Sequence, residues 1–243
     1  MSEHRVESPL ARRLFLAQLG AGVGAGIAGA SLVGSPAAAA QSAAEPSWRP
    51  ARHAQDDWLD KIPGVHRLLF DTTTADNLDL ALLWATNYVA TNLMAYGLKN
   101  TDLAVVIVTR HKATTFAYND AMWAKYPFGA SFNCKDASGN PEKANVYYKA
   151  QTSMSFDGDP GAGGNIYQDW SGEACLKRGA LFMVCHNALA AFAGMMAMAM
   201  HADPKATLAE WKANMLPGFL VVPAGVGALQ AAMENGWKIL PLI

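Results

Sequence analysis

The stretch Leu103-Ala104-Val105-Val106-Ile107-Val108 decides the fold class, because it is an unbroken run of apolar residues that are mostly β-branched. A strand that is buried on both faces of a parallel sheet has this composition, whereas a strand with one solvated face alternates apolar and polar side chains. The sequence therefore predicts a central strand of a parallel sheet over Leu103 to Val108.

Other apolar runs are separated by segments with apolar residues at three- and four-residue steps, which is the period of an amphipathic helix. The runs predict strands over Val65–Phe70, Ala180–Val184, Phe219–Val222 and Trp237–Leu240. The periodic segments predict helices over Asn77–Tyr96, Ala113–Lys125, Trp170–Lys177, Asn187–His201, Pro204–Met215 and Val226–Asn235. Because strands alternate with helices, we expect an α/β fold: a single-domain, three-layer parallel sheet of about five strands with a flavodoxin-like arrangement.

The overall charge excludes some classes of partner. The chain of 243 residues has 19 basic and 20 acidic side chains, which gives a net charge of −1. A nearly neutral chain is not expected to bind nucleic acid or to carry a polybasic membrane patch. The apolar fraction of 51% excludes a wholly disordered chain.

The first 40 residues have the organisation of an export signal. Arg12 and Arg13 precede the uncharged, glycine-rich stretch Leu14 to Gly34, and Ala37 to Ala40 supply a small-residue cleavage site. The paired arginines followed by Phe-Leu resemble the twin-arginine motif, so we expect a periplasmic protein. The alternative is a membrane helix, since 21 uncharged residues could span a bilayer, and an uncleaved signal would then be the only membrane contact.

The remaining chain divides by composition. Residues 41–62 form a polar leader, and residues 63–243 form the α/β domain. Residues 126–168 are rich in Gly, Asn, Asp, Ser and aromatic side chains and lack a sustained period, so they predict an irregular insertion in that domain.

Candidate site residues follow the predicted strands, because ligands of open parallel sheets bind beyond the carboxyl ends of the strands. The segments at these positions are Asp71–Thr74, Thr109–His111, Cys185–Asn187 and Pro223–Gly225. Within them, we expect a ligand pocket to include Asp71, Thr72, His111 and Gly225.

Cys185 stands at a predicted strand end and helix start, where backbone N–H groups and the helix dipole favour a thiolate. His186 could add to this effect when it is protonated. The alternative is a buried and inert cysteine at a tight turn. The other two cysteines, Cys134 and Cys175, could form a disulfide bond across the insertion, but no bridge or another pairing is equally compatible with the sequence.

The run Gly194 to His201 contains Met195, Met196, Met198 and Met200. Methionine-rich segments with histidine can bind Cu(I). Because these methionines alternate with alanine at helical spacing, the pattern favours core packing, and no metal site is predicted.

Two segments resemble a known family. Arg178 to Leu189 contains Gly-Ala-Leu-Phe-Met-Val-Cys-His-Asn, and Leu216 to Val226 contains a strand followed by Pro-Ala-Gly-Val. Both are similar to the DsrE/DsrF-like sulfur-relay family. The resemblance implies a small parallel α/β domain that usually forms oligomers and carries sulfur as a persulfide on a cysteine, here Cys185 with Asn187 as its partner residue. An export signal and a long insertion depart from the family pattern.

The sequence therefore predicts an exported, DsrE-like protein that handles sulfane sulfur or thiol redox chemistry. Its catalytic residues are expected to be Cys185, His186 and Asn187, with no cofactor. The expected partners are a sulfur donor or acceptor protein and further copies of the chain. Two alternatives remain open: a non-catalytic small-ligand or metal-binding module that uses His111, His186 and Asp71, and an oligomeric scaffold.

Overall fold

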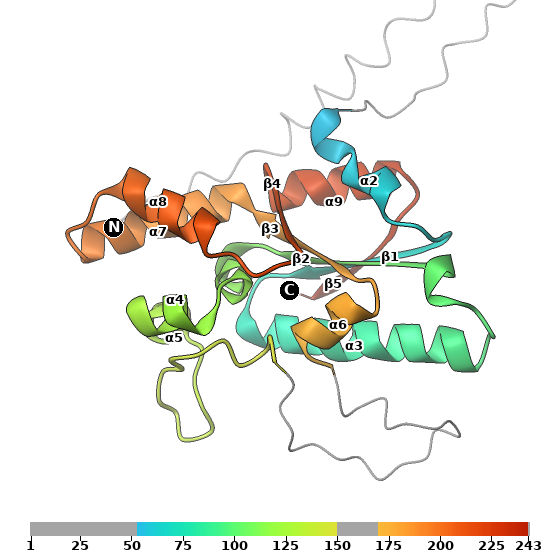
Figure 1. Ribbon diagram of the computed structural model, residues 1–243, viewed down its shortest axis with the longest axis horizontal. Coiled ribbons are helices and arrows are strands. Elements are labelled where there is room, and N and C mark those ends of the chain that lie inside the picture. Colours follow the sequence, from blue (N-terminus) through green and yellow to red (C-terminus); the bar gives the residue numbers. More distant parts are fainter. Residues whose placement is uncertain (1–52, 150–169, 243) are drawn as a thin grey trace, which may run out of the picture. The chain divides into compact units, whose positions relative to one another are not determined.

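A computed structural model describes residues 53–149 and 170–242 of the chain. It contains a five-stranded sheet in the order β4-β3-β2-β1-β5, in which every neighbouring pair is parallel (Figure 1). The strands are β1 (His66–Thr72), β2 (Leu103–Thr109), β3 (Leu181–Cys185), β4 (Phe219–Val222) and β5 (Lys238–Leu242). The predicted three-layer α/β fold with a five-stranded parallel sheet is confirmed.

The longer helices follow the predicted segments with small differences at their ends. The helices are η1 (Ala54–Asp56), α2 (Trp58–Lys61), α3 (Ala75–Met94), η2 (Asn100–Asp102), η3 (His111–Ala117), α4 (Asp120–Lys125), α5 (Phe128–Phe132), α6 (Gly172–Lys177), α7 (His186–Ala199), α8 (Pro204–Ala213) and α9 (Gly225–Glu234). The short elements η1, α2, η2 and α5 had not been predicted as helices. The single helix expected over Ala113–Lys125 is two elements, the 3-10 helix η3 and α4. The side chain of Asn119 separates them, because it accepts a hydrogen bond from the backbone of Met122 and so begins α4 as an N-cap.

The strand order determines which face each helix covers. The first four strands step across the sheet in one direction, so right-handed crossovers bring their connecting helices to one face. The connection from β4 to β5 runs back across the sheet and brings α9 to the opposite face. Figure 1 shows α3 and α6 on one side of the sheet and α9 with α2 on the other.

The central strand β2 explains why the sheet has two cores. All seven of its residues are buried. Leu103, Val105 and Ile107 join the core beneath α3, whereas the alternate residues Ala104, Val106 and Val108 join the core beneath α2 and α9. The unbroken apolar run is therefore the result of burial on both faces.

The predicted leader, residues 41–62, requires a correction at its carboxyl end. Trp58, Leu59 and Ile62 are buried in the core that α9 covers, and the Trp58 ring lies 5.7 Å from that of Trp237. Polar residues surround them in the sequence, so the segment had been predicted to lie outside the core. Three large apolar side chains, two on α2 and one directly after it, are enough to anchor the segment. Residues 41–52 lie outside the described range.

The described part of the predicted insertion, residues 126–149, also contributes to the core. Phe128 and Phe132 lie on the short helix α5 and are buried. Asn145 is buried as well, and its side-chain amide donates hydrogen bonds of 2.8 Å to the carbonyl oxygens of Phe116 and Tyr118. The segment lacks a hydrophobic period because aromatic packing and local hydrogen bonds hold it in place. Residues 150–169 lie outside the described range.

Within residues 53–149 and 170–242, no helix is long and apolar enough to cross a membrane. The uncharged stretch Leu14 to Gly34 and the predicted signal peptide, residues 1–40, lie outside these ranges.

Candidate functional site

Four residues from four neighbouring strands or their connections form a row at the carboxyl edge of the sheet. Asp71 belongs to β1, Arg110 follows β2, Cys185 ends β3, and Gly225 begins α9 after β4. This sequence of elements is also their order in the sheet. Parallel strands bring their carboxyl ends to one edge, so residues that are far apart in the chain meet there.

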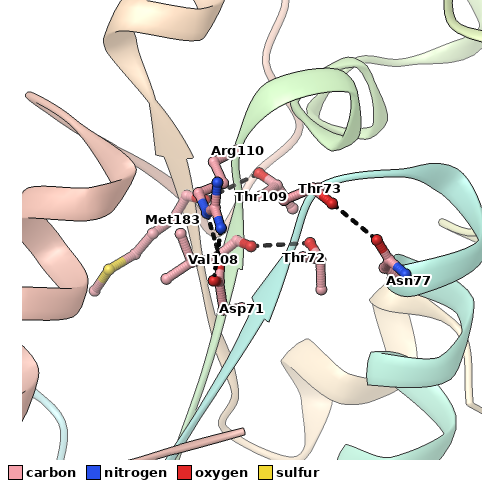
Figure 2. Close-up of polar contacts among 8 residues, drawn as sticks. All are labelled: Asp71, Thr72, Thr73, Asn77, Val108, Thr109, Arg110 and Met183. Carbon is pink, nitrogen blue, oxygen red and sulfur yellow. Dashed lines mark hydrogen bonds and ion pairs between the residues drawn. The ribbon is translucent and has the colours of Figure 1, made fainter. Parts of the chain in front are cut away.

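Arg110 and Asp71 form a bidentate ion pair (Figure 2). Arg110 Nε donates to Asp71 Oδ1 at 2.7 Å, and a terminal guanidinium nitrogen donates to Oδ2 at 2.9 Å. The Asp71 side chain is only 5% exposed, whereas that of Arg110 is 24% exposed. A planar guanidinium with two bonds to one carboxylate has a defined orientation, so this pair holds a cation at the edge of the sheet.

The electrostatics of Arg110 connect it to Cys185. The hydrogen bond to Asp71 is the main reason that the pKa of Arg110 is raised, and partial burial opposes this change. The negative charges of Asp71 and of a Cys185 thiolate raise the pKa of Arg110 further. Arg110 and Cys185 are therefore close enough to interact electrostatically.

Gly225 allows this close approach. A Cβ atom at Gly225 would lie 2.9 Å from Cβ of Arg110 and 3.4 Å from Cβ of Cys185. The first distance is shorter than a normal contact between carbon atoms. The absence of a side chain at Gly225 therefore lets the stem of Arg110 and the side chain of Cys185 pack against the start of α9.

Cys185 occupies the N-cap position of α7 and is 8% exposed. Unpaired backbone N–H groups and the dipole of this helix favour a negative charge at its N-terminus. Cys185 lies at the end of β3 and directly before α7, as predicted. The cation of Arg110 lies nearby, which the sequence had not indicated.

The other two cysteines have different surroundings. Burial raises the pKa of the Cys134 thiol to about 11, and the nearby acidic groups of Glu142 and Asp76 act in the same direction. Cys175 Sγ lies 3.8 Å from Thr86 Oγ1 and from the Leu82 carbonyl oxygen. All three cysteines lie in the described part of the chain and none forms a disulfide bond, so the Cys134–Cys175 bridge is absent.

The threonines at the strand ends join neighbouring strands. Thr72 donates its hydroxyl hydrogen to the Val108 carbonyl oxygen at 2.9 Å, and Thr109 donates to that of Met183 at the same distance (Figure 2). Both threonines are fully buried. The predicted pocket residue Thr72 therefore ties β1 to β2, and in this way it helps to place Asp71 beside Arg110.

The remaining predicted residues have different neighbours. His111 is exposed, has the left-handed φ of 51°, and its ring is roughly perpendicular to that of Phe192, with the centroids 5.7 Å apart. His186 is half-buried and lines a hollow of about 480 Å³ with Trp58 and Lys61. Asn187 is exposed on α7. The described residues contain no group of three or more His, Cys, Asp or Glu side chains that could hold a metal ion.

Two hollows border α2 rather than the ion pair. The hollow beside His186 is one, and the other has a volume of about 340 Å³ and lies between Trp58 and residues of α9 such as Ala228 and Glu234. Neither is lined by Cys185 or Arg110. Each of them is large enough to hold a small molecule.

Arg110 is the site residue that sequence reasoning missed. It lies in the segment Thr109–His111 at the carboxyl end of β2, but the predicted pocket included His111 of this segment and not Arg110. A cation directly after one buried strand and an acid at the end of another was the available signal. The two residues can form an ion pair because β1 and β2 are neighbours in the sheet. The order of the strands in the sheet is not evident from the sequence.

Comparisons with known proteins add little to this description. No family model and no curated protein matches the chain. Among solved structures, the chain is similar to the protein of unknown function MTH1491 from Methanobacterium thermoautotrophicum, with 16% identity, coverage of 73% of this chain and 99% of that chain, and a TM-score of 0.34. The likeness is coarse, and the interpretation of the site rests on the residues of this chain.

Proposed function

We propose that the protein accepts and carries sulfane sulfur as a persulfide on Cys185. The observation that supports this most strongly is the cation beside that cysteine: Arg110, held in place by Asp71 through two hydrogen bonds. A thiolate is the form of cysteine that reacts with electrophilic sulfur, and a fixed positive charge stabilises it. A persulfide anion at the same position would be stabilised in the same way.

The proposed step is a displacement at sulfur. The Cys185 thiolate attacks the sulfane sulfur of a donor persulfide or polysulfide. A new S–S bond forms at Cys185, the S–S bond of the donor breaks, and the donor leaves as a thiolate that takes up the electron pair. The reaction changes only which thiol holds the sulfane sulfur, so it requires no further oxidant or reductant.

The resemblance to the DsrE/DsrF-like family supports the same assignment. The segment around Val184-Cys185-His186-Asn187 is the one that carries the resemblance, and Cys185 lies at the end of β3 directly before α7. Two further features fit the proposal. The pKa of Cys134 is raised by burial and by nearby acidic groups, and Cys185 interacts electrostatically with the cation of Arg110.

The experiment is persulfide mapping by mass spectrometry. The protein is treated with polysulfide, the persulfides are blocked by alkylation, and the peptides are analysed without reduction. We expect an added sulfur on Cys185, loss of this adduct in Cys185→Ser, and its retention in the control Cys134→Ala. Absence of sulfur on Cys185, or equal labelling of Cys134, would refute the proposal.

A second candidate function is the binding of a small ligand in the hollow beside His186. This hollow combines an aromatic wall from Trp58 with the cationic side chain of Lys61. Native mass spectrometry of protein purified from its own host tests it. A co-purifying molecule of constant mass that is lost in Lys61→Ala but kept in Cys185→Ser would favour binding over sulfur transfer.

We also propose export through the twin-arginine route, on the sequence evidence alone. Fusing residues 1–40 to a reporter that folds in the cytoplasm tests it. Transport is expected with Arg12-Arg13 and not after both arginines are replaced with lysine; equal transport of the two fusions would contradict the proposal.

A further inference from the structure

Most methionine side chains in and directly after α7 are more exposed to solvent than expected for a helix that fills the core. Met196 is 5% exposed and belongs to the core. In contrast, Met195 is 54% exposed, Met198 is 68% exposed and Met200 is 42% exposed. The expectation that all four methionines fill the core is therefore wrong for three of them. The reason is that α7 buries only one face, which Leu189, Ala193 and Met196 occupy.

Met195 and Met198 lie on the outer face of α7. Residues three positions apart on a helix are neighbours, with about 5–6 Å between their Cβ atoms. The outer face begins with Asn187 and Ala191, which are exposed and precede Met195 at four-residue steps. The two thioether side chains therefore stand one turn apart near the carboxyl end of the helix.

His201 follows the carboxyl end of α7, two residues after its last helical residue, Ala199. Its backbone N–H donates to the Met198 carbonyl oxygen at 3.3 Å, so it lies directly beyond Met198. Its φ of 54° turns the chain away from the helix axis, and the residue is exposed. The carboxyl end of a helix carries a partial negative charge, which favours a bound cation.

We propose that Met195, Met198 and His201 form a surface binding site for Cu(I). Two thioether sulfurs and one imidazole nitrogen are soft or borderline ligands, which suit Cu(I) and not the hard cations Mg²⁺ and Ca²⁺. Long, unbranched methionine side chains can converge on one ion from adjacent turns. The site is independent of Cys185 and of sulfur transfer.

The experiment measures Cu(I) affinity in competition with a chromogenic Cu(I) chelator, without oxygen. The full chain carries Cys185→Ser as background, because a thiolate would compete for copper. We expect one equivalent of bound Cu(I), an affinity at least about tenfold lower in Met195→Leu/Met198→Leu, and a similar loss in His201→Ala. The matched control is Met233→Leu, since Met233 is 58% exposed on α9 with no other methionine within a helical turn.

X-ray absorption at the copper edge gives a second measurement that does not depend on affinity. Sulfur scattering is expected in the Cys185→Ser background and should be reduced in the double methionine variant. Unchanged affinity in that variant, or a loss of all copper binding on introducing Cys185→Ser, would overturn the proposal. A change in solution mass without a change in copper affinity would also overturn it and assign the methionines to self-association.

Discussion

Arg110 gives the candidate site its electrostatic character. The guanidinium is only partly buried, but its orientation is fixed, because both oxygens of the nearly buried Asp71 accept its hydrogen bonds. A side chain that is held in this way loses little freedom when an anion arrives beside it. At the scale of single residues, the proposed function therefore depends on this ion pair as well as on the thiol.

The first prediction concerns the reactivity of Cys185. In Arg110→Ala/Asp71→Asn, alkylation of Cys185 by iodoacetamide at pH 7 should be about tenfold slower, because the variant lacks the cation beside the reacting thiolate. Asparagine at position 71 avoids leaving a buried carboxylate without its partner. The rate is measured by peptide mass spectrometry.

Arg67→Ala is the control for this change. Arg67 is another half-buried arginine, but it lies at the amino end of β1, where its Nε donates to the Gly64 carbonyl oxygen at 3.2 Å. Its replacement should leave the alkylation rate of Cys185 unchanged. Equal rates in wild type and in the Arg110 variant would show that the guanidinium does not act on the thiol.

The second prediction concerns Gly225. Gly225→Ala places a Cβ atom 2.9 Å from Cβ of Arg110, so the contact must relax by moving one of the two chain segments. We expect a loss of about 1–3 kcal/mol in the free energy of unfolding and slower alkylation of Cys185. Chemical denaturation and the alkylation assay measure the two effects.

Gly227→Ala separates the packing effect from helix propensity. Gly227 lies on the same helix, but a Cβ atom there would have only Ala224 Cβ near it, at 3.9 Å. Alanine in a helix is favoured over glycine by about 0.5–1 kcal/mol, so this variant should be as stable as wild type or more stable. If the two alanine variants behave alike, the close approach at Gly225 has no effect of its own.

At the scale of elements, the short helix α2 has a larger role than its length indicates. It has only four residues, yet its Trp58 and Leu59 close the core beneath α9. Without it, the face of the sheet that contains Val106 and Val108 would have α9 as its main cover. The element therefore belongs to the domain, and two hollows of the described chain lie along it.

The third prediction tests this role. Trp58→Ala should lower the free energy of unfolding by about 3–5 kcal/mol, because it leaves a cavity in the core and removes the contact with Trp237. Urea denaturation followed by circular dichroism measures the change. Trp84→Ala on α3 is the matched control: Trp84 is 38% exposed, so its replacement should cost less than about 1 kcal/mol. Similar losses in both variants would place Trp58 outside the core.

At the scale of the whole molecule, burial determines how stability depends on alkaline pH. Burial raises the pKa of Cys134 from its ordinary value of 9.0 to about 11, and it raises the pKa of Tyr118 and Tyr147 in the same direction. The unfolded chain releases these protons at lower pH than the folded chain does. Their contribution to stability is therefore complete below the ordinary pKa values and is lost as the pH rises through the folded values.

The fourth prediction follows from this difference. The free energy of unfolding should fall between pH 9 and about 11, which is the window that the pKa of Cys134 defines. Cys134→Ala removes one of the contributing groups, so its decline across this window should be shallower than that of wild type. Denaturation curves at a series of pH values measure both. Parallel declines would mean that the Cys134 thiol is not protected from ionisation by burial.

Local patterns were sufficient for most of the fold. The strand over Phe219–Val222 has the predicted bounds, and the long helix α3 begins within two residues of its prediction. These elements are short-range features, because hydrophobic period and flanking turn residues are set by neighbours in the chain. The prediction was less accurate at Trp58 and at Phe128, where a few aromatic residues pack into the core from segments without a period.

The sequence by itself determined the alternation of strands and helices, the burial of β2 on both faces, and the place of Cys185 between a strand and a helix. Only the tertiary structure decided that Arg110 meets Asp71 and lies beside Cys185, and that Met195 and Met198 face outward. The physical reason is the separation along the chain between the residues that determine each feature. Periodicity is a local property of the chain, whereas the order of strands in a sheet and the buried face of a helix depend on contacts between distant segments.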